Sequence, residues 1–175
     1  MQGTGFTSPV VGEVHIIEGV VTASFPALKG FFVQEESMDQ DADSLSSEGV
    51  FVAVSNDEYP AQGSVVRAIG NVSESYGKTQ ISLNEAFLDC GVDSVSATSL
   101  SLPFSSSEAR ESIERMLVYV EDTLMVTDNY SLGRYGEVGL SKGGVYVPTN
   151  IHLPGSAEYT ALAASNALNS ITLDD

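Results

Sequence analysis

The first half of the chain alternates short apolar runs with short polar loops, a pattern that is typical of closely spaced β-strands. The pattern predicts five strands, at residues 13–24, 31–34, 50–54, 65–73 and 79–83. The first strand is long and rich in β-branched residues, and Gly19 in its middle predicts a bend of the kind at which a barrel turns a corner. Tyr76-Gly77-Lys78 predicts a tight turn between the last two strands.

Five strands, a bent first strand and a hairpin joining the fourth to the fifth match an OB-type barrel. Such a barrel usually has a helix between its third and fourth strands, but residues 55–63 are too few and too polar for more than a turn. We therefore expect a mainly β fold, with an OB-like five-stranded barrel rather than a standard one.

The second half has a less regular pattern. Ser105 to Glu108 offers helix-capping chemistry ahead of Ala109, Ile113 and Met116, which are spaced for one face of a helix. Further strands are predicted at 117–120, 124–127, 137–140, 145–147 and 171–173, and a helix capped by Ser156 at 157–167. We expect an OB-like barrel at 10–90 and a β-rich C-terminal extension with one or two short helices at 91–175. The two should pack as one structural unit, itself a fragment of a larger protein.

Charge constrains the partners of the chain. Seven Lys and Arg residues against 24 Asp and Glu residues give a formal net charge of −17. This charge repels nucleic acid and anionic membranes in general, and it favours solubility and cation binding. Any contact with nucleic acid must therefore come from a local basic group or a bound metal.

The sequence shows no targeting signal and contains a single cysteine. No apolar run approaches the roughly 18 residues that a membrane helix needs, so we expect no membrane insertion, and residues 1–6 show no signal peptide. The lone Cys90 has no partner within the chain. We expect a free, buried thiol, with pairing to a cysteine elsewhere as the alternative, and a monomer.

Several segments, in a fixed order, carry a resemblance to a known family. They are residues 2–5, 18–23, 30–35, 73–80, 102–104, 126–137 and 148–150. Together they resemble the OB-like domain that precedes the metal-dependent nuclease domain in bacterial extracellular nucleases. The DNYSLGRYGE run at 128–137 is the most specific of them, and the resemblance extends over nearly the whole chain.

The resemblance implies a secreted or surface-anchored parent that cuts nucleic acid with a divalent cation (Mg²⁺, Mn²⁺ or Ca²⁺) bound in a downstream domain. Cleavage with two metals needs clustered carboxylates, usually with His or Asn, and this chain has only His15 and His152, in unrelated contexts. We therefore expect a module that is not an enzyme, has no cofactor assigned, and assists DNA binding or positions the nuclease domain. The alternatives are a purely structural spacer and a module that binds carbohydrate or protein.

The first candidate nucleic-acid site lies in two loops of the expected barrel. OB barrels bind ligands with the loops that join strands one to two and four to five. Lys29 and Phe25 fall in the first loop, and Lys78 and Tyr76 in the second. Aromatic rings beside cations suit the stacking of unpaired bases over a neutralised backbone. In the alternative, 76–78 is simply a polar hairpin turn and Phe25 plugs the core.

The second candidate is the group Tyr130, Arg134 and Tyr135. An arginine between tyrosines can stack on a base or bind a phosphate with two hydrogen bonds. In the alternative, Arg134 pairs with Glu137 or another carboxylate and the tyrosines close the core.

An acidic loop predicts a third site. Asp39, Asp41 and Asp43, with Glu48 behind them, alternate oxygen ligands as calcium-binding loops do. The pattern is not an EF-hand, because Ser44 stands where the turn glycine belongs and Glu48 comes two positions early. A looser Ca²⁺ site and a solvated acidic loop are the two alternatives.

Overall fold

The computed structural model describes residues 1–40 and 43–174, and it is mainly β with few short helices. The chain forms two compact units. One consists of Met1–Thr98 and Glu108–Tyr119, and the other of Ser99–Ser107 and Val120–Asp175. None of the helices in the described ranges is long and apolar enough to cross a membrane.

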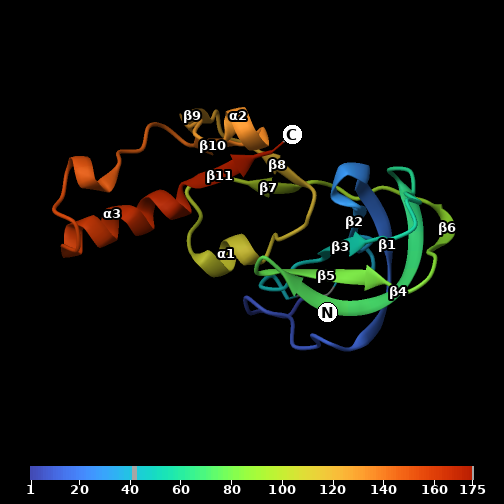
Figure 1. Ribbon diagram of the computed structural model, residues 1–175. Helices are drawn as coiled ribbons and strands as arrows, with labels where there is room; N and C mark the ends of the chain where they lie inside the picture. Colours follow the sequence, from blue (N-terminus) through green and yellow to red (C-terminus); the bar gives the residue numbers. More distant parts are fainter. Residues whose placement is uncertain (41–42, 175) are drawn as a thin grey trace. The chain divides into compact units, whose positions relative to one another are not determined.

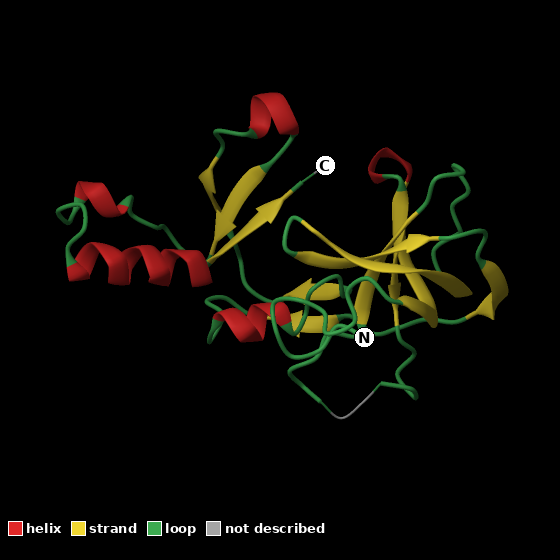
Figure 2. Ribbon diagram, turned by 60° about the horizontal axis from the view of Figure 1, so that its bottom comes forward, coloured by secondary structure: helices red, strands yellow, loops and turns green. Residues whose placement is uncertain are grey.

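Five strands of the first unit close into a barrel, which confirms the predicted fold class. They are β1 (Val14–Phe25), β2 (Gly30–Gln34), β3 (Gly49–Ala53), β4 (Ser64–Ser75) and β5 (Lys78–Leu83), within one or two residues of the predicted bounds. The ring runs β1-β2-β3-β5-β4 and closes through pairing of β4 with β1, as Figures 1 and 2 show. Only β3 and β5 are parallel. A sixth strand, β6 (Leu88–Val92), pairs with β4 outside the ring.

The first strand serves two neighbours, as its length and central glycine predict. β1 pairs with β4 from Val14 to Val20 and with β2 from Val20 onward, with a bulge between Val21 and Ala23. A Cβ atom at Gly19 would lie 2.6 Å from the Gln34 carbonyl oxygen. Glycine is therefore required where β1 crosses the end of β2.

Alternation along β2 and β3 separates a core face from an outer face. Phe31, Val33, Val50 and Val52 point into the barrel and are almost fully buried. The intervening residues point outward because successive side chains of a strand alternate. We call these the β2–β3 outer face: Gly30, Phe32, Gln34, Gly49, Phe51 and Ala53.

The polar connection between β3 and β4 contains no helix, as expected from its length. The chain instead places a helical segment from far along the sequence with the barrel unit: α1 (Ser107–Glu111) and the residues that follow. The predicted helix through Met116 is wrong after Glu111. The backbone turns at 112–115, and Arg115 has φ +63°.

Two short strands flank this segment, β7 (Thr98–Leu100) and β8 (Val118–Val120), and they pair with each other. β8 was predicted, whereas β6 and β7 were not. Cys90 lies in β6, where every residue is exposed, so the expectation of a buried thiol is wrong. Its exposure follows from the position of β6 outside the closed ring.

The second unit contains a three-stranded antiparallel sheet, with strand order β11-β10-β9. The strands are β9 (Met125–Asp128), β10 (Val138–Ser141) and β11 (Ser170–Leu173), all close to predicted strands. The helix α3 (Ala157–Leu168) begins after Ser156, whose hydroxyl accepts a hydrogen bond from the Tyr159 amide at 3.1 Å. The strand predicted at 145–147 is wrong, and a short helix α2 (Leu132–Tyr135) stands where a loop was expected.

The second unit has few buried side chains. Leu100, Leu102 and Phe104 are buried in its first segment. Among the described residues from Val120 to Asp174, the only buried side chain is Ser141. The apolar residues of the sheet and of α3 are therefore either exposed or only partly buried.

Candidate functional site

Lys29, the first predicted cation, is neutralised by a neighbour. It follows a short 3₁₀ helix, η1 (Pro26–Leu28), in the β1–β2 connection. Its Nζ atom lies 2.5 Å from Asp57 Oδ1, and the Tyr59 hydroxyl donates to the same oxygen at 3.1 Å. The hydrogen bond to Asp57 raises the pKa of Lys29 and lowers the pKa of Asp57. A phosphate at Lys29 would meet the negative charge of Asp57 beside the lysine.

Tyr76 and Lys78 form the β4–β5 hairpin turn. Tyr76 and Gly77 both have positive φ, as the central residues of a tight two-residue hairpin turn do. The Tyr76 side chain is fully exposed, and Lys78 makes no ion pair with any residue that the structure describes. The Tyr76 ring is accessible, and the charge of Lys78 acts on Glu111 and Glu114.

The barrel does not bring the two lysines together. Lys29 follows the C-terminal end of β1, where Phe25 pairs with Gly30. The turn before Lys78 lies beyond the N-terminal end of β1, because Val14 pairs with Asn71 and β4 continues to Ser75. The two predicted loops therefore do not form one joint site for the two cations, since the 12-residue strand β1 separates them.

Three aromatic rings gather on and beside the β2–β3 outer face. Phe32 and Phe51 are paired across the strands, with ring centroids 5.0 Å apart. Phe25 contacts Phe32 edge to face at 5.8 Å and is 42% exposed, so it is neither a core plug nor a free ring. This aromatic surface occupies the position at which OB barrels usually hold ligands.

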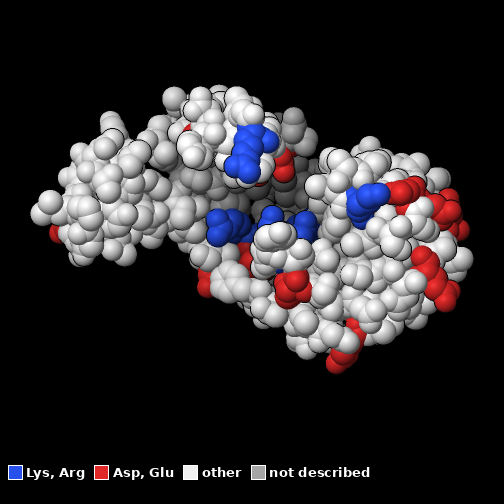
Figure 3. All heavy atoms as spheres, in the orientation of Figure 1, with Lys and Arg blue, Asp and Glu red and all other residues white. Residues whose placement is uncertain are grey.

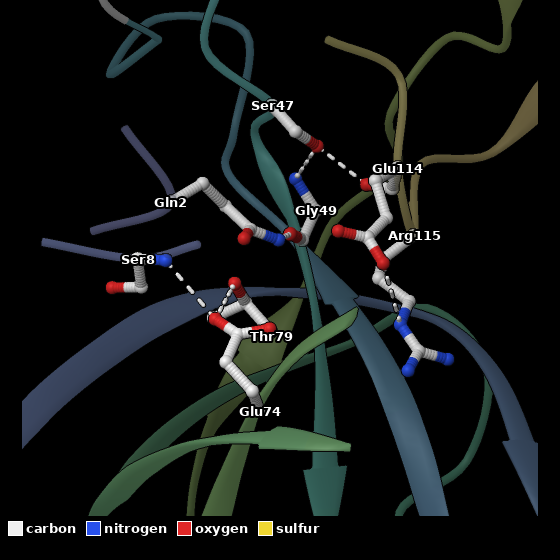
Figure 4. A network of polar contacts seen from close by, with 8 residues as sticks. All are labelled: Gln2, Ser8, Ser47, Gly49, Glu74, Thr79, Glu114 and Arg115. Carbon is white, nitrogen blue, oxygen red and sulfur yellow. Dashed lines mark hydrogen bonds and ion pairs between the residues drawn. The ribbon is translucent and has the colours of Figure 1, made fainter. Parts of the chain in front are cut away.

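The chain itself covers this surface. We call residues 113–116 the Arg115 turn. The guanidinium carbon of Arg115 lies 5.6 Å from the ring centroid of Phe32 and 5.4 Å from that of Phe51. Two hydrogen bonds tie the neighbouring backbone down: Ser47 Oγ donates to the Glu114 carbonyl at 2.5 Å, and the Leu117 amide donates to Gln34 Oε1 at 2.9 Å. Figure 4 shows Ser47 bridging Gly49 and Glu114.

Burial changes the acid–base properties of this turn. The Glu114 carboxylate and the Arg115 Nε atom lie 3.7 Å apart, with side chains only 11% and 16% exposed. Burial, with a smaller contribution from the charge of Glu111, raises the pKa of Glu114 to about 7, although Arg115 opposes the shift. Burial also lowers the pKa of Arg115. Glu114 Oε1 and Arg115 Nε make no hydrogen bond to any described atom.

A second polar group closes the barrel near the β4–β5 turn. Glu74 Oε1 accepts from the Ser8 amide at 3.0 Å and from the Thr79 hydroxyl at 2.8 Å. Gln2 donates to the Gly49 carbonyl at 2.5 Å. These contacts, seen in Figure 4, hold the N-terminal segment against the barrel, and we assign them a structural role.

The group Tyr130, Arg134 and Tyr135 lies around α2 in the second unit. The Arg134 guanidinium carbon stands 5.0 Å from the ring centroid of Tyr135. Tyr130 is 92% exposed and Tyr135 54% exposed, so the alternative in which the tyrosines close the core is wrong. No ion pair joins Arg134 to a carboxylate in the described part of the chain.

The predicted calcium loop borders a cavity of about 820 Å³ in the barrel unit. Asp39, Asp43 and Glu48 line it together with other carboxylates, and Asp41 lies outside the described residues. Within the described ranges, no three His, Cys, Asp or Glu side chains gather closely enough to hold a metal ion. The calcium site stays a prediction.

Most cations of the chain are compensated. Of the seven Lys and Arg residues, Lys29, Arg67, Arg115 and Lys142 each have a nitrogen within 4 Å of a carboxylate oxygen. In Figure 3 the blue group at the right lies beside red atoms, and the surface over α3 is almost free of either colour.

Sequence reasoning missed Phe32, Phe51 and Arg115. A signal was present for the first two, since alternation through residues 30–34 and 49–53 puts these rings on the face opposite the core. No local signal pairs Arg115 with them, because about 60 residues separate Arg115 from β3 in the sequence.

The chain matches no model of a known protein family, and no curated protein matches it.

Proposed function

We propose that this chain is a non-catalytic module of an extracellular nuclease, and that it positions the nuclease domain by packing against it. Two observations support the proposal. The first is the resemblance of residues 126–137 and the other segments to the OB-like domain of bacterial extracellular nucleases. The second, on which the proposal mainly depends, is the exposed apolar surface of the second unit.

The apolar surface of the second unit consists of residues from its sheet and from the loop before α3. Met125, Val126, Tyr146, Val147, Ile151, Leu153 and Leu173 are each more than half exposed. Because this unit also has few buried side chains, we take these residues as a surface that another protein covers.

The composition of the same region supports a protein partner rather than nucleic acid. Between Gly143 and Leu173 the sequence has a single charged residue, Glu158, although the whole chain has 31. Depletion of charge is typical of the centre of a protein–protein interface. A surface that binds DNA needs the opposite, a concentration of Lys and Arg.

The barrel offers little to DNA. Its lysines lie at opposite ends of β1, its aromatic surface is covered by the Arg115 turn, and the chain carries a net charge of −17. These observations favour positioning over substrate binding for the barrel unit.

The test uses single aspartate substitutions in the intact parent nuclease. Val147→Asp and Leu153→Asp place a charge on the apolar surface at residues that are 58% and 81% exposed. We expect each to lower the rate of DNA cleavage and to speed limited proteolysis between the domains, while the melting temperature of this chain alone stays unchanged. A charge buried at an interface core costs several kcal/mol, so a loss of about tenfold or more is expected.

Val92→Asp is the matched control, because Val92 is a valine of the barrel unit that is 86% exposed. It should leave cleavage and proteolysis as in the wild type. Equal behaviour of Val147→Asp and Val92→Asp in both assays would contradict the proposed docking surface.

A second candidate function is a direct contact with DNA through Tyr130, Arg134 and Tyr135. It is favoured by the exposed rings and by an arginine that is stacked but not ion-paired in the described structure. Fluorescence anisotropy at low salt, with single-stranded and duplex DNA and with and without Ca²⁺, tests it. The candidate requires binding that Arg134→Ala weakens by about tenfold and Lys78→Ala leaves nearly unchanged. Flat titrations to high micromolar would remove it.

A further inference from the structure

The β2–β3 outer face holds a ligand that belongs to the chain itself. Phe32 and Phe51 present adjacent rings, and the planar guanidinium of Arg115 lies within 6 Å of both centroids. Arginine in this geometry is bound by attraction to the ring faces, an attraction that is stronger where water is excluded. With 16% of its side chain exposed, Arg115 is largely removed from water.

The carboxylates around the aromatic pair define which ligands suit it. Glu114 lies 3.7 Å from Arg115, and the charge of Glu111 acts on Glu114. A planar cation gains from the rings and from the carboxylates at once. A nucleotide would gain the stacking, and its phosphate would be repelled by Glu111 and attracted by Lys78, whose charges both act on Glu114.

The backbone at Arg115 is not one that an arginine prefers. Its φ of +63° lies in the left-handed region, where glycine is at ease and a branched or long side chain is strained. A residue is held in this conformation when its surroundings fix it. Here the hydrogen bond from Ser47 to the Glu114 carbonyl fixes the backbone, and the contacts of the Arg115 side chain with the two rings add to it.

The turn is held by individual contacts and not by a helix or a strand of its own. α1 ends at Glu111 and β8 begins at Val118, so no regular element spans the turn. Its backbone rests directly on β3: a Cβ atom at Gly49 would lie 2.5 Å from the Arg115 carbonyl carbon. The hydrogen bonds from Ser47 and to Gln34 also hold it, together with the bond from the Thr98 amide to the Leu117 carbonyl at 2.9 Å and the stacking of Arg115 on the two rings.

We propose that the β2–β3 outer face is a binding site for guanidinium groups, that Arg115 fills it in the resting chain, and that the site accepts an arginine side chain of a partner when the Arg115 turn is released. This inference goes beyond the proposed function and does not rest on it, since the docking surface lies in the second unit. The Arg115 turn then acts as a latch that competes with the partner for one site.

The test removes the Arg115 side chain from the site and then adds a small guanidinium compound that can take its place. Arg115→Gly removes the side chain and suits the positive φ, so the turn keeps its backbone conformation. We expect hydrogen exchange at the Leu117 amide to become about tenfold faster, the equivalent of one lost cation–π contact. Millimolar methylguanidinium should restore the slow exchange and shift the ring resonances of Phe32 and Phe51, and methylammonium at the same concentration should do neither.

Three variants complete the test. Arg115→Lys keeps the positive charge but lacks the planar guanidinium group. Hydrogen exchange at its Leu117 amide should be nearly as fast as in Arg115→Gly. Gly49→Ala, which pushes the turn off β3 with Arg115 still present, should also speed exchange. Arg110→Ala, a matched loss of charge at an exposed position of α1, should leave exchange at Leu117 unchanged.

Several results would overturn the proposal. The first is hydrogen exchange at the Leu117 amide that is no faster in Arg115→Gly than in the wild type. The second is an equal effect of methylguanidinium and methylammonium on Arg115→Gly. The third is an effect of methylguanidinium on Arg110→Ala as large as its effect on Arg115→Gly. Binding of oligothymidylate by Arg115→Gly without binding of methylguanidinium would also overturn it, because the face would then select bases. None of these results bears on Val147→Asp, so failure here and failure of the docking surface are distinguishable.

Discussion

Phe31→Ala should destabilise the barrel unit by about 3–5 kcal/mol, which is the usual cost of removing a buried phenylalanine from a well-packed core. Phe31 has no exposed surface and lies in the core cluster, and its ring packs edge to face on Phe87 with centroids 5.5 Å apart. Because the strands form a closed barrel around this position, the surrounding residues cannot move in to fill the cavity that the substitution creates. Urea denaturation followed by far-ultraviolet circular dichroism measures the loss as a lower midpoint at a similar slope.

Phe6→Ala is the control, because Phe6 is 54% exposed and its truncation leaves no cavity. Its effect should stay within about 0.5 kcal/mol. A Phe31→Ala variant as stable as Phe6→Ala would mean that the strands do not enclose a packed core in solution.

The barrel could be predicted because its sequence signals are local. The apolar runs of β2 and β3, the period-two alternation of β4 and the turn at Tyr76-Gly77 depend on neighbours in the sequence. Gly19 also carried a correct signal, since it permits the close approach of β1 to Gln34. The barrel closes because the long strand β1 pairs with the strands at both ends of the order β2-β3-β5-β4, namely β2 and β4.

The helix after Ser107 shows where the local signal failed. Ala109, Ile113 and Met116 have helical spacing, yet α1 ends at Glu111. The hydrogen bonds of Glu114 and Leu117 to Ser47 and Gln34 replace those that would continue the helix. Tertiary contacts thus override the helical preference of the segment.

The candidate surfaces could be predicted only in part. The sequence identifies Tyr130, Arg134 and Tyr135 as a group because the residues are near one another in the chain. It cannot place Lys29 and Lys78 relative to each other, since their distance depends on the register of β1 with β4. Asp57, which neutralises Lys29, is likewise 28 residues away.

Glu114 makes the stability of the barrel unit depend on pH in an unusual direction for a carboxylate. Its pKa rises from 4.5 to about 7 on folding, because burial penalises the charge and Glu111 repels it. Arg115, Lys78 and the Thr79 amide act in the opposite sense and do not compensate. The folded chain therefore binds the proton more tightly than the unfolded chain, and the contribution of Glu114 is complete below pH 4.5 and is lost as the pH rises through 7.

Glu114→Gln should remove this dependence, because the amide stays neutral at every pH. At pH 8 we expect the variant to be more stable than the wild type by about 1–2 kcal/mol, a discounted value for a side chain that keeps some contact with water. Near pH 4.5 the two should differ little, since both side chains are then largely uncharged. Urea midpoints at the two pH values measure the change, and exposed Glu85→Gln is the control for the loss of one charge. Equal shifts for both variants at pH 8, or a less stable Glu114→Gln, would show that attraction to Arg115 outweighs the burial of the Glu114 charge.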